Sequence, residues 1–240
     1  MAIEVLEQLY EGKAKRVYKT TDENIYMIEY KDDATAFNGE KRGTINGKGV
    51  INNKMSAMLF KELEKHGIET HLVELIDDSH MLVKNVEIVL LEVISRNIVA
   101  GSLAKRVGKE EGFVLPQPIL EFSYKDDALG DPMINRYHAT ALGIATDEEI
   151  DEIVAQAFKI NEILQDVFAK ANLTLVDFKL EFGRLPNGKI ILADEISPDT
   201  CRLWDKDTQE KLDKDRFRRD LGGVEEAYIE VYRRLQEIGL

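Results

Sequence analysis

The chain has 240 residues, with 32 Lys or Arg against 45 Asp or Glu, so its formal net charge at pH 7 is −13. This acidic balance excludes a non-specific grip on nucleic acid or on an anionic membrane surface, so an anionic ligand must be bound by a local cluster of cations. Hydrophobic residues make up 44% of the sequence, enough for a substantial globular core. The single Cys201 excludes an intrachain disulfide, and the four histidines lack zinc-site spacing. With no signal-peptide pattern and no membrane span, we expect a cytoplasmic protein.

A basic turn stands near the N-terminus, where Gly12 is followed by Lys13, Ala14, Lys15 and Arg16 and then by strand-like residues. Glycine lets the backbone approach a phosphate closely, and lysine supplies positive charge. The pattern is not a P-loop, which needs two glycines at fixed spacing and a following helix. Taken alone, it is more typical of an ordinary exposed basic turn than of a phosphate loop.

Residues 32–53 form a long polar stretch with several glycine turn signals and with neither helical nor strand periodicity. Loops of this length inside a compact protein are usually functional or mobile, so we expect a flap on the substrate side. A core helix is predicted over 51–66, because its apolar residues recur on one stripe and Gly67 follows.

Two strands are predicted next, over 71–76 and 80–83, followed by a nearly continuous β-branched run over 86–94. Such a run is typical of a strand that is buried on both faces. The polar segment from Lys84 to Glu87 separates the runs, and we place there the boundary between two lobes, 1–85 and 86–240.

A second cationic cluster follows the buried strand, with Arg96 at its end and Lys105 and Arg106 in a short helix. Ser102 is expected to cap this helix, whose free N–H groups would attract an anion. The cluster indicates a phosphate pocket, although surface cations on a helix explain the spacing equally well.

The middle of the chain offers fewer signals. Pro116 and Pro118 predict a loop, and polar turns without decisive spacing follow it. Thr146 opens a core helix, with Glu149 completing a capping box and apolar residues recurring at three- and four-residue steps from Ile150 to Ala171, and a last helix is expected over 224–235.

The stretch 174–205 is the most informative part of the sequence. Hydrophobic residues alternate strictly with Asp177, Lys179 and Glu181, which places these three ionisable groups on one face of a strand. A turn at 186–188 and a second strand at 190–195 predict a hairpin. If its loop has two or four residues, Leu185 faces Ile190 and Glu181 lies directly opposite Asp194.

Opposed carboxylates repel unless a cation lies between them, and a hard divalent cation completed by phosphate oxygens is the usual solution. A solvated charged strand face is the alternative. Lys179 on the same face and the basic, aromatic sequel at Arg202 favour the metal and phosphate interpretation.

Five motifs in this order, GKAKRVY, SRNIVAGSLAKR, VDFKLEFG, LADEISPDTCRLWD and DKDRFR, resemble the SAICAR synthetase (phosphoribosylaminoimidazole-succinocarboxamide synthase) family over essentially the whole chain. The resemblance implies an α+β or α/β fold with a small antiparallel-sheet N-terminal lobe and a larger α/β C-terminal lobe, distantly similar to protein kinases and ATP-grasp enzymes. ATP would bind between the lobes, with 84–87 as the adenine hinge. The implied reaction joins L-aspartate to carboxyaminoimidazole ribonucleotide (CAIR) at the expense of ATP, with Mg²⁺ as cofactor, in a homodimer.

The resemblance also implies residue roles. ATP-binding positions are Gly12, Lys13, Ala14, Lys15, Val17, Lys84, Val86, Lys125 and Lys179. Magnesium ligands are Glu181 and Asp194, and the ribonucleotide is held by Arg96, Ser102, Asp177, Arg202 and Arg218. Lys179, Asp177 and Arg218 are the catalytic candidates, and Asp177 either reaches the ribose or orients Lys179. Several relatives carry an aspartate in the flap where this chain has Asn38, which cannot act as a base.

Two other functions remain open from the residues alone. A small-molecule kinase would use the same metal and phosphate groups, and would leave a stable phosphorylated product. A non-catalytic nucleotide-binding regulator would keep the basic turn and the hinge but lose the metal ligands, and both Glu181 and Asp194 are present.

Overall fold

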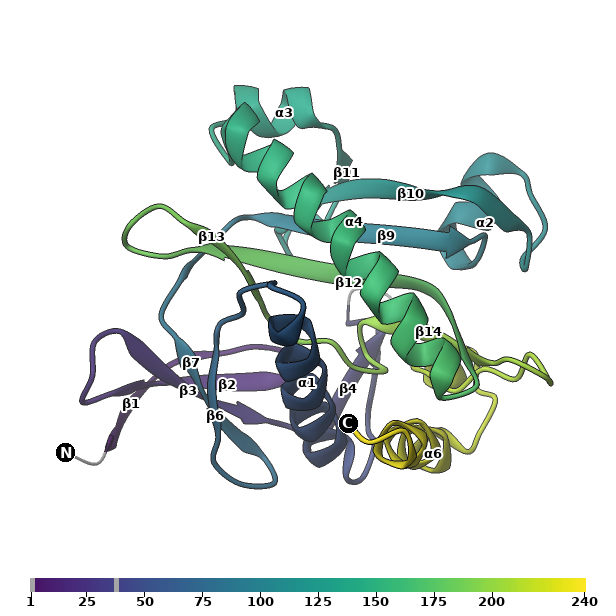
Figure 1. Cartoon of the computed structure of the whole chain (residues 1–240), viewed down its shortest axis with the longest axis horizontal. Helices are drawn as coiled ribbons and strands as arrows, with labels where there is room; N and C mark the ends of the chain where they lie inside the picture. Colours follow the sequence, from purple (N-terminus) through teal and green to yellow (C-terminus); the bar gives the residue numbers. More distant parts are fainter. Residues whose placement is uncertain (1–2, 37–38) are drawn as a thin grey trace.

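The computed structural model describes residues 3–36 and 39–240, and its two main sheets are both antiparallel (Figure 1). The first sheet comes from the N-terminal part of the chain and has five strands. Their order is β1 (Val5–Glu11), β2 (Lys15–Thr20), β3 (Ile25–Tyr30), β7 (His80–Lys84) and β6 (Leu72–Leu75). The basic turn lies between β1 and β2, at one end of this sheet.

The second sheet has seven strands and is organised around one long strand, β12 (Leu173–Arg184). Its main order is β11 (Met133–Ile134), β10 (Val114–Tyr124), β9 (Leu91–Ile98), β12 and β13 (Ile190–Ala193). Two further strands, β14 (Cys201–Asp205) and β8 (Glu87–Ile88), also pair with β12. The chain therefore passes from the first sheet to the second between the end of β7 and the start of β8, although the division into lobes 1–85 and 86–240 stays a prediction.

Helices cover both sheets, and the two longest are the ones expected from periodicity. Their bounds are α1 (Lys48–Lys65), α2 (Gly101–Val107), α3 (Arg136–Ala141), α4 (Asp147–Lys170), α5 (Asp215–Arg218) and α6 (Val224–Glu237). In Figure 1, α4 crosses the second sheet, and α1 lies against the first. The capping box of α4 is confirmed: Glu149 N donates to Thr146 Oγ1 at 3.2 Å, and Thr146 N donates to the Glu149 carboxylate at 2.9 Å.

Three expectations about elements are wrong. The stretch 32–53 is not irregular, because β4 (Asp33–Ala36) and β5 (Lys41–Thr44) form a small sheet there and α1 already begins at Lys48. The run 86–94 is not one strand, since β8 and β9 are separated by a short break. The segment of Pro116 and Pro118 belongs to β10, in the irregular part where pairing with β9 jumps from Val114 to Ile119. Proline is tolerated at such bulges because no ladder hydrogen bond is lost.

Asn38, the flap position where several relatives carry an aspartate, lies outside the described residues.

The two sheets share one hydrophobic core, which brings together buried residues from both parts of the chain. Met55, Phe60 and Met81 belong to the same cluster as Phe168 and Phe182. The backbones also meet directly, because His71 N donates to Leu192 O at 2.8 Å and Leu192 N donates to Glu69 O at 3.0 Å. Within the part of the chain that the structure describes, no helix has the length and apolarity needed to cross a membrane.

Candidate functional site

A cavity of about 640 Å³ lies where the two sheets meet, and it collects nearly all of the predicted site residues. Those that line it are Gly12, Lys13, Ala14, Lys15, Val17, Lys84, Val86, Arg96, Lys125, Asp177, Lys179, Glu181, Asp194, Arg202 and Arg218. Ser102 is not among the lining residues and is exposed on α2. The N-cap of that helix is Ala100, without a side-chain hydrogen bond, so the expectation that Ser102 caps it is wrong.

The predicted hairpin is present, but its register differs by one residue from the expectation. Glu181 pairs with Ala193 and Arg184 with Ile190, so Glu181 is not directly opposite Asp194. The reason is the turn: Leu185 N donates to Lys189 O at 2.9 Å, which leaves three residues in the loop instead of two or four. Gly188, with φ 84, supplies the left-handed residue that three-residue hairpin loops use.

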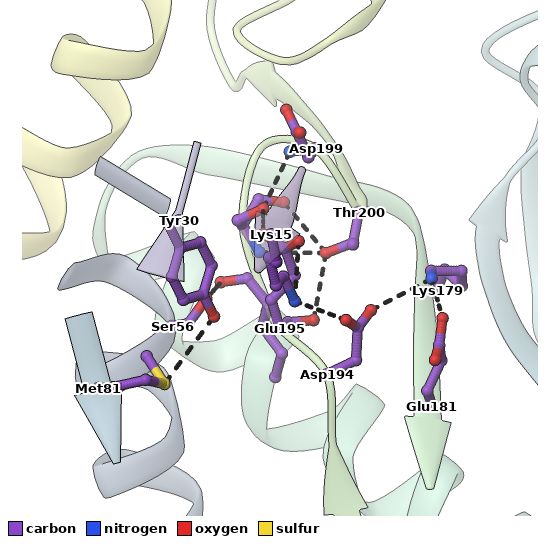
Figure 2. A network of polar contacts seen from close by, with 12 residues as sticks. Lys15, Tyr30, Ser56, Met81, Lys179, Glu181, Asp194, Glu195, Asp199 and Thr200 are labelled. Carbon is purple, nitrogen blue, oxygen red and sulfur yellow. Dashed lines mark hydrogen bonds and ion pairs between the residues drawn. The ribbon is translucent and has the colours of Figure 1, made fainter. Parts of the chain in front are cut away.

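Glu181 and Asp194 nevertheless both contact the side chain of Lys179, although they are not directly opposed in the ladder. Asp194 follows β13 with φ 60, a left-handed conformation that is uncommon for a residue with a side chain and that occurs often at functional sites. Lys179 Nζ lies 3.2 Å from Asp194 Oδ2 and also bonds to Glu181, as Figure 2 shows. Lys125 Nζ lies 2.9 Å from Glu181 Oε1, and Lys15 Nζ lies 2.6 Å from Asp194 Oδ1. The acidic pair is therefore bridged and flanked by three ammonium groups.

Three groups of this cluster, Asp194, Lys15 and Lys179, hold one another in their ionised forms. Burial alone would raise the pKa of Asp194, but attraction to Lys15 and Lys179 outweighs it and keeps that pKa far below the ordinary range. Burial alone would lower the pKa values of Lys15 and Lys179, but the neighbouring carboxylates raise both well above the usual value. These three groups thus carry fixed charges at neutral pH, which is the state needed to organise a polyphosphate.

A second charged cluster surrounds Asp177 on the same strand. Its neighbours in the ladders on either side are Arg96 of β9 and Arg202 of β14. Their Nη1 atoms lie 2.8 Å and 2.9 Å from Asp177 Oδ2. Asp215 holds Arg202 at 3.0 Å and Arg218 at 2.7 Å, so two carboxylates fix three guanidinium groups. Planar guanidinium groups held in this way suit bidentate contacts with phosphate or carboxylate.

The other side of the cavity is more apolar, with Val17, Ile28 and Val83 among its lining residues. The predicted hinge residue Lys84 lies beside it, with Nζ 2.8 Å from the Glu69 carboxylate. The exposed Lys13 lies at the rim and pairs with Asp127 at 2.6 Å. An apolar slot beside ammonium groups matches a base and its phosphates.

Several lining residues were missed by the sequence reasoning. They are His71, Glu92, Glu195, Asp199, Thr200 and Lys214. Asp199 and Thr200 stand in the LADEISPDTCRLWD motif and Lys214 in DKDRFR, so the motifs themselves were the available signal. His71 had no such signal in the sequence. In the structure burial lowers its pKa to about 3, and its Nε2 atom has no hydrogen-bond partner among the residues that the structure describes.

Among residues 3–36 and 39–240, no three side chains of His, Cys, Asp or Glu are arranged to hold a metal ion by themselves. Two carboxylates, Glu181 and Asp194, share the bridging lysine described above. A magnesium ion is commonly bound by one or two carboxylates together with substrate phosphates and water, so this donor set fits Mg²⁺ on a nucleotide.

Many known proteins match this chain in sequence or in fold. The family model described as SAICAR synthetase matches residues 8–235. A phosphoribosylaminoimidazole-succinocarboxamide synthase from Coprothermobacter proteolyticus is 61% identical over 233 residues, which cover 97% of this chain and 99% of that protein. The crystal structure of the synthase from Ehrlichia chaffeensis is 44% identical, with a TM-score of 0.94 over 96% of this chain and 98% of that one. A SAICAR synthetase in complex with ADP is 52% identical, with a TM-score of 0.92 over 95% of this chain and 97% of that one.

The match spans both sheets, the hairpin and the two charged clusters of the cavity. The family model covers residues 8–235, and a member of the family is 61% identical over nearly its whole length. The chain belongs to the SAICAR synthetase family.

Proposed function

We propose that this protein is an ATP-dependent ligase of purine biosynthesis that joins L-aspartate to the carboxylate of CAIR, giving SAICAR, ADP and phosphate. The observation that carries the proposal is a single cavity that holds both charged clusters: the Glu181 and Asp194 pair with its lysines, and the arginines around Asp177. Membership of the family, together with the ADP complex of a relative, supports the part of the proposal that concerns ATP.

The chemistry has two steps. A carboxylate does not react with an amine at neutral pH, because the carboxylate is stabilised and its oxygen is a poor leaving group. In the first step a carboxylate oxygen of CAIR attacks the γ-phosphorus of ATP, and ADP leaves. In the second step the neutral α-amine of aspartate attacks the acyl phosphate, the C–N bond forms, phosphate leaves, and the nitrogen gives up its proton.

The protein contributes position and charge to these steps. Lys13 and Lys15 bind the ATP phosphates, while Lys179 neutralises charge that develops on the transferred phosphoryl group. Arg96 and Arg202 hold the ribonucleotide phosphate, and Arg218 holds its carboxylate end. Fixing both reactants removes most of the entropic barrier to their meeting.

Mg²⁺ would be held by Glu181 and Asp194, together with oxygens of the nucleotide. Bound there, the ion would neutralise phosphate charge and polarise the phosphorus. Lys15 and Lys125 would orient the two carboxylates through their ion pairs with Asp194 and Glu181.

The function is tested by measuring phosphate release from ATP with CAIR and L-aspartate present together and with each omitted. We expect release only with the complete mixture. A small-molecule kinase would instead phosphorylate its acceptor without aspartate, so ATP turnover that ignores aspartate refutes the ligase. The family match does not favour the kinase or the silent regulator.

The proposed metal ligands are tested by Glu181→Gln and Asp194→Asn, which keep the side-chain size and remove the charge. We expect kcat to fall by at least about a hundredfold in each, because a phosphoryl transfer site loses charge stabilisation. Glu7→Gln is the matched control, since Glu7 is on the exposed strand β1 and, among residues 3–36 and 39–240, forms its ion pair with Lys19. Near-wild-type rates over a range of Mg²⁺ concentrations in both cavity variants would refute the metal assignment.

A homodimer and a cytoplasmic location also belong to this proposal, and both rest on the family resemblance. The single buried Cys201 is compatible with a reducing compartment. Sedimentation equilibrium should give twice the monomer mass, and a mass that stays monomeric at micromolar concentration would refute the dimer.

A further inference from the structure

Asp213 is a buried acidic residue that neither of the proposed chemical steps uses. Its side chain is fully buried, and it is not among the residues that line the cavity. Burial raises its pKa to about 7, and the negative charge of Asp215 adds to this effect. A carboxyl group that is costly to ionise at this position indicates a role that an apolar residue could not fill.

The Asp213 side chain links β14 to α5. Its Oδ2 atom accepts a hydrogen bond from Leu203 N of β14 at 2.8 Å, and its Oδ1 atom accepts one from Asp215 N, at the start of α5, at 2.7 Å. Leu212 N also donates to Leu203 O at 2.8 Å, so Leu203 is held through both its N–H and its carbonyl group. Two backbone N–H groups converge on this side chain, and a carboxylate offers a separate acceptor oxygen to each of them.

The two linked segments carry groups that surround the proposed ribonucleotide site. Arg202 directly precedes Leu203, and its Nε atom lies 3.0 Å from Asp215 Oδ2. Arg218 Nη1 lies 2.7 Å from the other oxygen of Asp215. The position of Asp215 relative to β14 therefore decides how the two guanidinium groups lie with respect to each other, and Asp213 fixes that position.

Arg202 has little room to adapt if this link is lost. Its Nη1 atom lies 2.9 Å from Asp177 Oδ2, and a Cβ added at Gly101 would lie 2.5 Å from its Nη2 atom. The guanidinium group is thus packed between a carboxylate and the backbone at the start of α2. A shift of α5 would weaken the contact with Asp215, because the arginine could not follow it.

We propose that Asp213 is a positioning residue for the ribonucleotide, which holds α5 against β14 so that Arg202 and Arg218 keep one arrangement before the substrate binds. The proposal rests on the proposed function, in which both arginines contact CAIR. Asp213 itself does not touch the ligand. Without its two hydrogen bonds the arginines would have to be ordered during binding, and that cost would weaken the affinity for CAIR. ATP should bind as before, because Lys15 and Lys179 lie on β2 and β12, outside the linked segments.

The test is Asp213→Asn, which keeps the size of the side chain and replaces one acceptor oxygen by an amide group that faces a backbone N–H. Asp205→Asn is the matched control, because Asp205 lies at the other end of β14, is also buried, and accepts from Asp207 N at 2.9 Å and from Thr208 N at 2.8 Å. The KM of each substrate is measured with the other two saturating, well below the unfolding temperature. We expect the KM of CAIR to rise about 10-fold in Asp213→Asn, the loss that corresponds to one hydrogen bond to a charged group, while the KM of ATP stays within about twofold. The control should unfold at a lower temperature and keep all three KM values.

Asp213→Ala, which removes both acceptors, should raise the KM of CAIR further than Asp213→Asn does. A purely structural role predicts instead that the substitutions at 213 and 205 both lower the unfolding temperature and that neither changes the KM of CAIR. That result, or an equal rise in the KM of ATP, overturns the proposal. If neither substitution of Asp213 gives a folded protein, Asp213→Glu, which keeps both acceptors on a longer side chain, is judged by the same rule. A wild type that releases no phosphate from the complete mixture refutes the function itself, whereas an active wild type with an unchanged KM of CAIR in the variants refutes only the role of Asp213.

Discussion

Among single residues, the buried His71 makes the stability of the fold depend on pH. Burial, together with the charge of Lys15, lowers its pKa from 6.5 to about 3. The folded chain therefore binds fewer protons at this site than the unfolded chain between those two pKa values. The stabilisation is fully present above the unfolded pKa and is lost as the pH falls below it.

We expect this residue to lower the free energy of unfolding by about 2 kcal/mol between pH 7 and pH 5. His71→Phe, which can still pack against Phe60, should remove that part of the pH dependence. Urea unfolding at the two pH values measures it, with His66→Phe as the control because His66 is 51% exposed. Equal pH dependence in the wild type and the His71 variant would contradict the assignment.

The sequence correctly predicted which face of an element a side chain lies on where a local pattern sets that face. Strict alternation was enough to put Asp177, Lys179 and Glu181 on one face of a strand. The pairing of Lys48 with Asp199 joins positions 151 residues apart, and no local period carries that information. The same applies to Asp177, whose two arginine neighbours are set by strand order and not by its own neighbours in sequence.

Among the elements, the contact between β12 and the connection after β7 leaves no room for a side chain. A Cβ added at Gly183 would lie 2.4 Å from Val86 Cγ2 and 2.7 Å from Val86 Cβ. Overpacking of this kind typically costs about 1–3 kcal/mol. Val86 lines the cavity, so its displacement also reaches the side of the cavity proposed to bind the nucleotide.

We therefore expect Gly183→Ala to lower the free energy of unfolding by about 1–3 kcal/mol and to raise the KM of ATP. A double-mutant cycle with Val86→Gly provides the control, because removing that side chain relieves the clash. The double variant should be less destabilised than the sum of the two single variants. Strict additivity in urea unfolding would show that the two residues do not interact.

Elements with strong local signals were predicted more accurately than those without. The helix α4 has an apolar stripe and a capping box, and its start was predicted from Thr146 and Glu149. The hairpin register failed by one residue because Asn187 and Gly188 are compatible with more than one loop length. The strand β10 was missed since Pro116 and Pro118 indicate a loop, and only its partner β9 makes the segment extended.

For the whole molecule, the shared hydrophobic core predicts one unfolding transition and not two. Residues of the first sheet and of α4 belong to the same buried cluster, and Leu192 of β13 exchanges backbone hydrogen bonds with Glu69 and His71, just before β6. A lobe that shares its core with another gains little by unfolding alone. Saturating ADP should raise the transition temperature without splitting it, because a ligand of the folded state stabilises by mass action.

The measurement compares Trp204 fluorescence with far-ultraviolet circular dichroism during thermal unfolding. Trp204 is the single tryptophan and lies in β14, so it reports the second sheet alone, whereas circular dichroism reports every element. We expect the two curves to coincide. A fluorescence transition displaced from the circular dichroism transition would mean that the two sheets unfold separately.

At this scale, composition could predict only a globular, acidic chain with a local cationic site. The two-sheet architecture followed from the family resemblance, because no periodicity reveals that β12 pairs with four other strands. The cavity between the sheets depends on that pairing. From a sequence without recognisable relatives we would have predicted the charged face of β12. We would not have predicted which parts of the chain lie across the cavity from it.

The strand β12 has a further consequence for how such a chain can change over evolutionary time. Consecutive side chains on one face of a strand are about 7 Å apart, so Asp177, Lys179 and Glu181 divide the cavity at fixed intervals. Inserting or deleting one residue between them would turn the downstream carboxylate into the core and bring a phenylalanine or leucine out in its place. The turn at 186–188 has no such restriction. Length variation among descendants of this sequence should therefore accumulate at the turn, while the spacing from 177 to 181 stays frozen.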